Sequence, residues 1–499
     1  MQRWSLFIPP LAVFAVLAAN AGVDHYFRDE FYYLACTHRL AWGYVDHPPL
    51  SIAILWLVRQ IAGDSLAALR IPAAAAAAAS VWLTGSIARR LGAATYGQLL
   101  AMTAAAIAPM LLALGTFYSM NIFDVLIWTA IARLLLDAID MPTDRRWITL
   151  GIVIGLGLLN KISVLWLGGG IAAGLVLAPA RRLLLTRGPW IAGAIAAAIF
   201  LPHIVWQMTH GWPTLEFIRN ASREKMQTNT PLSFLREVTL AMQWPTLPVW
   251  AGGLTLLLAT RARSGPRVLG IAIVFVAVLL IANRTSRTAY LAPVFPALFA
   301  AGGVLWERWL THRVARAAAV LVLVAAGALS LPLAVPLLPV DTYVRYSRAL
   351  GVVPSNDEKQ ELGRLPQFIA DRQGWDRFAA EIAAAWARLT PRERATAAVL
   401  TGNYGEAGAI ELLDRASGIR VVSGHNNYWL WGPDGATGEV LIVLSRAPDR
   451  LREQFASVDR VGESNCGDCM PFENHQGIYI CRGLRGSLRD RWPAIKHYI

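Results

Sequence analysis

The stretch that decides the fold is LFIPPLAVFAVLAANAGV (residues 6–23), followed shortly afterwards by DEFYY (residues 29–33). The first part is apolar and close to the length of about 20 residues that a membrane-spanning helix needs. No small-residue cleavage pattern precedes the polar loop, so we expect a retained span rather than a signal peptide. The second part gathers acidic and aromatic residues just outside that span. Packing does not require them there, and they predict a reaction carried out at the membrane surface.

The composition places the whole chain among polytopic membrane proteins. Of its 499 residues 55% are hydrophobic and 16% are charged, and the mean hydropathy is +0.43. A soluble domain usually carries about 25% charged residues. The net charge of +13 would suggest nucleic acid in a soluble protein. Here the Arg residues lie between apolar segments, so membrane topology explains the charge and no nucleic-acid partner is expected.

Apolar segments of spanning length predict about eleven transmembrane helices. The candidates are residues 5–23, 66–88, 95–114, 122–139, 147–159, 162–179, 190–206, 232–258, 267–282, 289–306 and 316–338. They make residues 1–339 a transmembrane domain. The polar pair Asn160-Lys161 predicts a helix break at the membrane edge.

The loops between these spans alternate in charge. One set is basic and marks the cytoplasmic side. It contains Arg3, Arg89, Arg90, Arg145, Arg146, Arg181, Arg182, Arg187, Arg261, Arg263, Arg267, Arg308, Arg313 and Arg316. The other set is expected on the outer face and consists of residues 24–49, 115–121, 160–161, 210–231 and 283–290. An odd number of spans also puts the tail outside.

The tail, residues 340–499, is predicted to be a soluble α/β domain. Helical patterns occur at 375–389 and 405–416, and strand-like runs occur at 397–401, 440–444 and 478–481. Its length of about 150 residues is enough for a core of its own. Gly402, Gly405 and Gly408 resemble a nucleotide loop, but a strand-to-helix turn that requires glycine is the favoured interpretation.

The acidic pair Asp29 and Glu30 is the first candidate for catalysis. Neighbouring residues on a helix do not face the same side, so the two carboxylates cannot both point into one cavity. One is a catalytic candidate, and the other is a helix-terminus or salt-bridge partner. Alternatively, both simply stabilise the N-terminus of a helix over residues 31–41.

The sequence Asp46-His47-Pro48-Pro49 closes the same loop. The prolines hold the backbone extended and then start a helix at a fixed angle. Residues 48–63 are too short to span, and they predict an amphipathic helix along the membrane interface. His47 could cap that helix, bind a metal or contact phosphate.

Three cations on the predicted outer face break the positive-inside trend. They are Lys161, Arg284 and Arg287, and Tyr290 follows the last of them. Lysine at a membrane edge often snorkels, but a cation there is also a functional-site hypothesis. An anionic partner such as a lipid phosphate explains the cluster best. We expect the charged ends of Lys161 and Arg287 to be solvated.

Several motifs occur together in order over about residues 20–310. They are the Asp29-Glu30 loop, Pro48-Pro49-Leu50, Gly157-Leu158-Leu159-Asn160-Lys161, Trp206-Gln207 with His210-Gly211-Trp212-Pro213, and Tyr290 to Leu298. This set resembles the GT-C membrane glycosyltransferases related to protein O-mannosyltransferases, lipid A aminoarabinose transferase and the lipopolysaccharide-core galacturonosyltransferases. The tail resembles the outer domains of bacterial members in residues 403–407 and 424–429.

The resemblance implies transfer of a hexosyl or pentosyl group from a polyprenyl phosphate to an envelope glycolipid, glycan or protein. This reaction would take place on the outer face of the bacterial inner membrane. It implies that Asp29 is the general base and that Lys161 and Tyr290 contact the donor phosphate.

The resemblance also places a second acid at Asn121 or Asp124. Asn121 cannot act as a base, so the role of that position is open. His47 stands where the aminoarabinose transferase has Lys, so phosphate binding there depends on pH or has moved to Arg284 and Arg287. No cofactor is expected, and nothing in the sequence supports a divalent metal.

Cysteine is sparse. Cys466, Cys469 and Cys481 lie in the tail on the oxidising side, where disulfides persist. No second ligand pair at metal spacing follows Cys466 and Cys469, so one disulfide is favoured over zinc. The expected pairing is Cys469–Cys481 or Cys466–Cys481, and Cys36 is expected to be inert.

The alternative function is a transporter or flippase of polyprenyl-linked lipids. Such a protein would also carry outer cations and many spans. Transporters tend to show inverted repeats and charges at the bilayer midplane. Here the charges gather on one face and a large outer domain follows, so the enzyme is favoured.

Overall fold

The computed structural model describes residues 3–260 and 263–499, which leaves Arg261 outside the described part. Its contacts divide the chain into two compact units. The first unit comprises Met1–Val23, His47–Thr209 and Gln227–Tyr343. The second comprises Asp24–Asp46, His210–Met226 and Val344–Ile499. The acidic first loop therefore packs with the tail residues in one unit.

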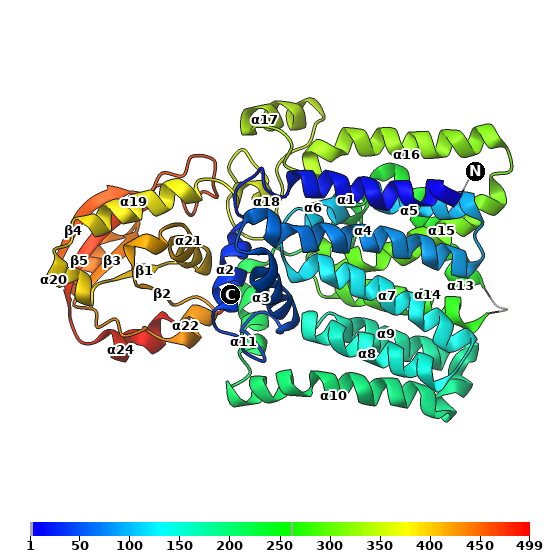
Figure 1. Ribbon diagram of the computed structural model, residues 1–499, viewed down its shortest axis with the longest axis horizontal. Helices are drawn as coiled ribbons and strands as arrows, with labels where there is room; N and C mark the ends of the chain where they lie inside the picture. The colour runs from blue at the N-terminus through cyan, green and yellow to red at the C-terminus, as the bar shows by residue number, and fades with distance from the viewer. Residues whose placement is uncertain (1–2, 261–262) are drawn as a thin grey trace. The chain divides into compact units, whose positions relative to one another are not determined.

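The first unit is helical, and its long helices run side by side (Figure 1). Its elements are η1 Arg3–Phe7, α1 Ile8–Asn20, α3 Leu50–Ala62, α4 Leu66–Leu91, α5 Thr95–Ile107, α6 Pro109–Gly115, α7 Met120–Asp140, α8 Asp144–Asn160, α9 Val164–Leu177, η2 Pro179–Leu185, α10 Arg187–Thr209, α12 Pro231–Ala241, η4 Trp244–Thr246, α13 Leu247–Ala259, α14 Ser264–Ala282, η5 Thr288–Val294, α15 Phe295–Trp309 and α16 Arg313–Ala334. Helix α8 packs against α10, α9 against α14, and α4 against α1, α7 and α15.

Five helices among the described residues are long and apolar enough to cross a membrane, or up to seven if each bent pair is one span. The five are Leu66–Leu91, Arg187–Thr209, Ser264–Ala282, Thr288–Trp309 and Arg313–Ala334. The bent pairs are α5 with α6, at 63°, and α9 with η2, at 105°. These helices are those of a multi-pass membrane protein. The larger number of about eleven spans stays a prediction.

The predicted span 232–258 is wrong as a single helix. The structure breaks it into α12, η4 and α13. The break lies at Gln243, whose φ of 76° is in the left-handed region, and at Pro245, which has no N–H to continue a helix. Apolar composition made the stretch look continuous.

Two predicted helix boundaries are confirmed. Helix α8 ends at Asn160, and Lys161 after it is extended, with φ −156° and ψ 133°. Helix α3 begins at Leu50, directly after the two prolines. Lys161 therefore stands at a break in the helical backbone, and its side chain need not continue the face of α8.

The second unit contains a five-stranded mixed sheet in the order β2-β1-β3-β5-β4. Strand β1 pairs in parallel with β2 and β3, whereas β5 pairs antiparallel with β3 and β4. The strands are β1 Ala398–Thr401, β2 Val421–Ser423, β3 Val440–Ser445, β4 Phe455–Glu463 and β5 Gly477–Leu484. The runs predicted at 397–401, 440–444 and 478–481 are confirmed as strands.

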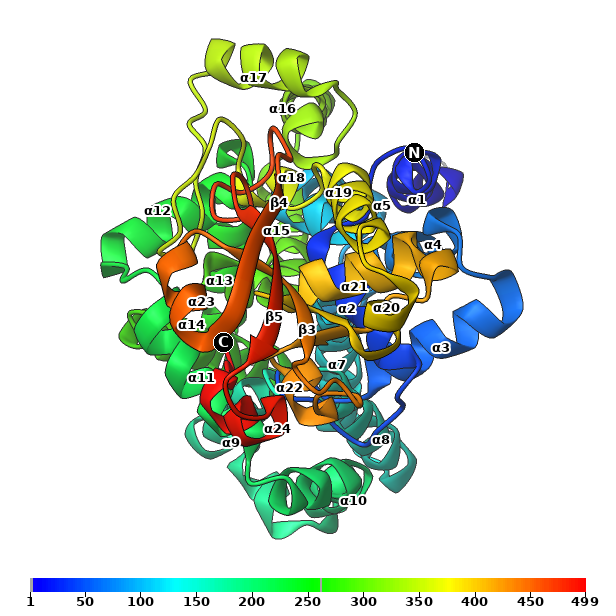
Figure 2. The same ribbon diagram turned by 90° about the vertical axis from the view of Figure 1, so that its left-hand side faces the viewer.

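The second unit also contains helices and helical turns, some of which lie against this sheet. They are α2 Arg28–Thr37, α11 Pro213–Asn220, the π-helical turn η3 Ala221–Lys225, α18 Gln367–Ala370, α19 Trp375–Ala387, α20 Pro391–Thr396, α21 Tyr404–Leu413, η6 Arg415–Ser417, α22 Asn427–Trp431, α23 Pro448–Gln454, α24 Leu488–Arg491 and η7 Trp492–Ile495, and α17 Val340–Ala349 crosses the unit boundary. Helices α19 and α21 contact the sheet on one side, and α23 lies on the other (Figure 2).

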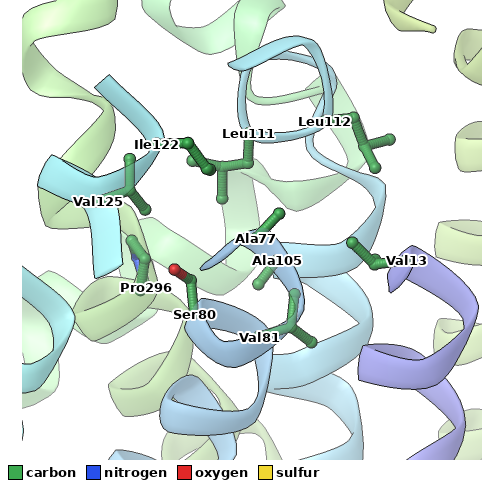
Figure 3. A pocket seen from close by; sticks show the side chains of 10 residues that line it. All are labelled: Val13, Ala77, Ser80, Val81, Ala105, Leu111, Leu112, Ile122, Val125 and Pro296. Atoms are coloured by element: carbon green, nitrogen blue, oxygen red, sulfur yellow. The ribbon is translucent and has the colours of Figure 1, made fainter. Parts of the chain in front are cut away.

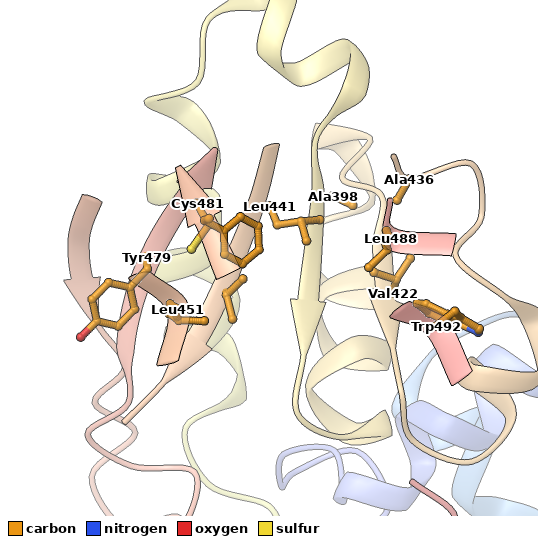
Figure 4. Close-up of a cluster of buried hydrophobic side chains, with 11 residues drawn as sticks. Ala398, Val422, Ala436, Leu441, Leu451, Tyr479, Cys481, Leu488 and Trp492 are labelled. Carbon is orange, nitrogen blue, oxygen red and sulfur yellow. The ribbon is translucent and has the colours of Figure 1, made fainter. Parts of the chain in front are cut away.

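One face of the sheet forms an apolar core (Figure 4). Leu441 and Cys481, paired across β3 and β5, are fully buried there with Leu488 and Trp492. The expected pairing of Cys481 with Cys469 or Cys466 is therefore wrong: the disulfide joins Cys466 to Cys469. Cys481 is a free, buried thiol whose side chain packs in the core, and Cys36 is also free and buried.

Helix α2 packs closely on α21 because two glycines of α21 have no side chain. A Cβ added at Gly405 would lie 2.3 Å from Cγ of Arg28, and one added at Gly408 would lie 2.8 Å from Cβ of Phe31. Both positions lie within α21. Gly405 and Gly408 thus serve the contact between α21 and the first-loop helix, whereas Gly402 lies in the turn between β1 and α21.

Gly408→Ala is expected to destabilise the protein. The new methyl would also lie 2.9 Å from backbone atoms of Phe31, which cannot rotate away. Overpacking of this kind costs about 1–3 kcal/mol, more than the roughly 1 kcal/mol gained by replacing glycine in a helix. A lower melting temperature measures the loss. Gly193→Ala in α10, where nothing lies within 4 Å, is the control and should not lower it.

Candidate functional site

The two acids of the first loop have different surroundings. The carboxylate of Glu30 accepts a hydrogen bond from the backbone N–H of Phe27 at 2.8 Å, and its residue is fully buried. It closes the first turn of α2 and acts as a helix cap. The side chain of Asp29 keeps 32% of its surface exposed. Asp29 is the acid of the pair that a substrate could reach.

Asp29 has two polar neighbours in the second unit. The hydroxyl of Tyr404 donates to its Oδ1 at 2.7 Å, and Nε of Arg28 lies 3.9 Å from the same oxygen. Tyr404 is the first residue of α21. The carboxylate is therefore held by one residue of its own helix and one from the tail.

The start of α2 is anchored to a corner of the tail that precedes α19. The backbone N–H of Arg28 donates to the carbonyl of Asp371 at 3.0 Å, and Nη1 lies 3.5 Å from the carboxylate of Asp371. Arg372 donates to Asp24 at 2.7 Å. Burial raises the pKa of Asp371 to about 6, and the nearby Arg28 opposes that rise.

The other end of the loop is held in the same unit. The hydroxyl of Tyr32 lies 2.8 Å from Oδ1 of Asp46 and 3.1 Å from Oδ1 of Asn427. The backbone N–H of Val45 donates to the same Asn427 oxygen at 2.7 Å. His47 begins the next segment of the first unit, where it is buried and its Nδ1 donates to the carbonyl of Pro48 at 3.1 Å.

Three predicted residues of the first unit come together around a fourth, Lys161. Its Nζ donates to Oδ1 of Asn121 at 2.8 Å and lies 3.7 Å from a carboxylate oxygen of Asp124. It also lies 5.0 Å from the centre of the Tyr290 ring, within the range of a cation–π contact. Helix α7 supplies the two acceptors, the break after α8 supplies the lysine, and η5 supplies the ring.

The expectation that the Lys161 ammonium is solvated is wrong. Lys161 is 8% exposed and Asp124 is 1% exposed. The hydroxyl of Ser163 lies 2.8 and 3.0 Å from the two carboxylate oxygens of Asp124. The buried cation is thus paired with a buried anion. Both candidates for the second acid, Asn121 and Asp124, contact it.

Arg284 and Arg287 lie in the turn between α14 and η5. Arg284 is exposed, and its backbone carbonyl accepts from the N–H of Asn229 at 2.7 Å. Arg287 is half-buried and directly precedes η5, which carries Tyr290. The backbone carbonyl of Arg287 accepts from the N–H of Tyr290 at 3.1 Å, which links this turn to the residue that contacts Lys161.

Sequence reasoning missed three residues that shape the two clusters. Ser163 follows Lys161 by two positions, and Tyr404 lies in the quoted motif at 403–407 without a role assigned to it. Asn427, in the quoted 424–429 motif, holds the end of the first loop. Polar residues inside a motif were the available signal, but their partners could not be inferred.

One pocket of the first unit is apolar and holds none of the candidate residues (Figure 3). It is lined by Val13, Ala77, Ser80, Val81, Ala105, Leu111, Leu112, Ile122, Val125 and Pro296. The Ser80 hydroxyl, the polar side-chain group in this lining, donates to the carbonyl of Ala76 at 2.8 Å. No group of three or more His, Cys, Asp or Glu side chains in the described part of the chain could hold a metal ion.

Known proteins match this chain in sequence over part of its length. Residues 46–206 match the family described as dolichyl-phosphate-mannose-protein mannosyltransferase. The lipid A galacturonosyltransferase RgtD of Rhizobium johnstonii is 30% identical over 222 residues, which are 41% of this chain and 43% of that protein. The match thus spans less than half the length of that relative.

Solved structures match the fold over most of the chain. The crystal structure of ArnT from Cupriavidus metallidurans bound to undecaprenyl phosphate gives a TM-score of 0.65 at 14% identity, covering 95% of this chain and 97% of that one. An oligosaccharyltransferase from Archaeoglobus fulgidus gives 0.52 at 12% identity, covering 83% and 63%. The chain therefore has the GT-C fold, and its resemblance to the GT-C membrane glycosyltransferases is confirmed.

Proposed function

We propose that the protein is an inverting glycosyltransferase that takes a sugar from a polyprenyl-phosphate donor. The acceptor is an envelope glycolipid, glycan or protein on the outer face of the bacterial inner membrane. The observation that carries the proposal is the Lys161 cluster, because a cation at a helix break beside Tyr290 suits a phosphate on a lipid chain. ArnT, whose fold this chain shares, binds undecaprenyl phosphate.

The proposed chemistry uses the carboxylate of Asp29 as a base and the cations to stabilise the leaving phosphate. Asp29 accepts the proton of an acceptor hydroxyl, a step worth about 10²–10⁴-fold in rate. The acceptor oxygen bonds to the anomeric carbon as the bond from that carbon to the donor phosphate breaks. The electron pair stays on the phosphate oxygen, and the product is polyprenyl phosphate. A phosphate monoester has a second pKa of about 6, so its departure needs no general acid.

The leaving phosphate does need its charge stabilised, which falls to the cations. The buried Lys161 would meet the phosphate in surroundings of low dielectric, where charge stabilisation is strong, and the half-buried Arg287 and the exposed Arg284 would add positive charge. Asp124, whose carboxylate lies 3.7 Å from the lysine Nζ, holds the lysine side chain in place when no donor is bound. Glu30, which caps α2, supports the helix that carries the base.

Direct assay tests the proposal. Purified protein supplied with polyprenyl-phosphate sugars, both hexosyl and pentosyl, and with envelope acceptors is expected to release free polyprenyl phosphate as the acceptor gains mass. Mass spectrometry of envelope glycolipids from a deletion strain identifies which acceptor and sugar to supply. Movement of intact donor across a vesicle bilayer, with no loss of sugar, would instead identify a flippase and overturn the transferase.

A further inference from the structure

Tyr404 is the residue of the tail that contacts the Asp29 carboxylate. The two residues are separated by 375 positions, and the oxygen–oxygen distance of 2.7 Å is that of a strong hydrogen bond. Apart from Arg28 on its own helix, Asp29 has no other hydrogen-bond or ion-pair partner among the described residues. The orientation of this carboxylate therefore depends on the phenol.

The backbone of Tyr404 is fixed by its neighbours. Asn403 caps α21, because its Oδ1 accepts from the N–H groups of Gly405 at 2.8 Å and Glu406 at 3.0 Å. The N–H of Tyr404 donates to Nδ1 of His425 at 3.2 Å. Burial lowers the pKa of His425 well below its usual value, so the ring is neutral and can accept this bond. Its other nitrogen, Nε2, then donates to an oxygen of Ile499 at 2.9 Å.

The ring of Tyr404 is held between two other rings. Its centroid lies 4.5 Å from that of Tyr32 and 4.6 Å from that of His425, and both pairs are stacked. Burial, together with the negative charge of Asp29, raises the pKa of Tyr404 well above its usual value. The phenol is consequently a protonated donor at physiological pH, and it can only adopt the direction that its packing allows.

We infer that Tyr404 is a positioning residue for the catalytic base: its hydroxyl selects the carboxylate rotamer in which Asp29 meets the acceptor. The inference rests on the proposed function. It gives the tail a part in the reaction, since Tyr404 of the tail orients the carboxylate of Asp29 in the first loop. Tyr404 itself acts through Asp29 and need not touch the substrate.

A second tyrosine provides a matched control. Tyr428 is also buried, and its hydroxyl donates to the carboxylate of Glu411 at 2.9 Å. Glu411 belongs to α21, the same helix that Tyr404 begins. The two bonds are alike in burial and chemistry, but only one of the two acceptors is the proposed base.

The test compares Tyr404→Phe with Tyr428→Phe. Each change removes a hydroxyl and keeps the ring, so both proteins should fold and melt at similar temperatures. Tyr404→Phe is expected to lower kcat about ten- to a hundredfold, the scale of one hydrogen bond to a charged group, with the donor KM unchanged. Tyr428→Phe should leave kcat within about twofold of wild type. The Tyr428 hydroxyl does not contact the proposed base, so activity requires only that this variant still folds.

Each outcome has a separate meaning. Equal kcat for the two variants and wild type would overturn the positioning role while leaving the transferase intact. A fall in kcat shared by both variants, with a shared drop in melting temperature, would assign both tyrosines to packing and also overturn it. Wild-type protein that transfers no sugar from any donor would instead remove the proposed function on which the inference depends.

Discussion

Asp29→Asn is expected to cut turnover at least about a hundredfold, because an amide cannot take the acceptor proton and general-base catalysis contributes about 10²–10⁴-fold. The substitution keeps the shape of the side chain. Its amide oxygen can still accept from the hydroxyl of Tyr404, so packing of α2 on α21 should survive. Donor affinity and melting temperature should therefore stay close to wild type. The measurement is the initial rate of polyprenyl phosphate release by purified protein.

The neighbouring acid supplies the control. Glu30→Gln removes the charge but leaves an oxygen that can accept from the N–H of Phe27, so the cap of α2 persists. We expect a much smaller effect on turnover than for Asp29→Asn. The reverse order would move the base to Glu30, and near-wild-type rates in both variants would take this loop out of the chemistry.

Much of the helical fold could be predicted because polar residues interrupt apolar runs. The polar pair Asn160-Lys161 indicated the break after α8 in this way, and the two prolines before Leu50 indicated the start of α3. The break between α12 and α13 was not, since it depends on the positive φ of Gln243 within an apolar stretch. Hydropathy reports where a segment can lie, but not where its backbone turns.

The sheet shows the same limit. Strands β3 and β5 are nearly continuous apolar runs with both faces covered, so they were recognisable. Strand β4 lies at one edge of the sheet and only its first residue is buried, so its charged residues gave it no apolar pattern to recognise. Strand β2 has only three residues. Cys481 lies on β5 inside the core, and the disulfide joins the other two cysteines of the tail. Cysteine spacing alone does not predict that Cys481 is buried there.

Individual site candidates could be recognised because burying a charged or polar residue at the edge of an apolar segment costs free energy, and such residues are usually functional. The residues that these candidates contact could not be predicted in the same way. The resemblance names both Lys161 and Asn121 as site residues, and they are 40 positions apart, whereas the hydrogen bond of Tyr404 with Asp29 joins residues 375 positions apart. A single sequence contains no signal that two residues so far apart along the chain come into contact in the folded protein.

The burial of Lys161 changes what its removal should do. Lys161→Met leaves the Asp124 carboxylate buried without its cation, with Ser163 as a remaining donor. Breaking a buried ion pair on one side costs about 3–5 kcal/mol. We expect a large loss of folded protein and of melting temperature, so a loss of activity in this variant alone would say nothing about donor binding.

The double variant Lys161→Met with Asp124→Asn separates stability from binding. It removes both charges, and the asparagine can still bond with the hydroxyl of Ser163, so most of the stability should return. Compared with Asp124→Asn alone, which keeps the lysine, it should bind polyprenyl phosphate more weakly by about 1.5–3 kcal/mol, the worth of a hydrogen bond to a charged group. That difference is a tenfold to hundredfold rise in Kd. Equal affinity in the two proteins would mean that Lys161 serves the fold and that the donor phosphate is bound by other cations.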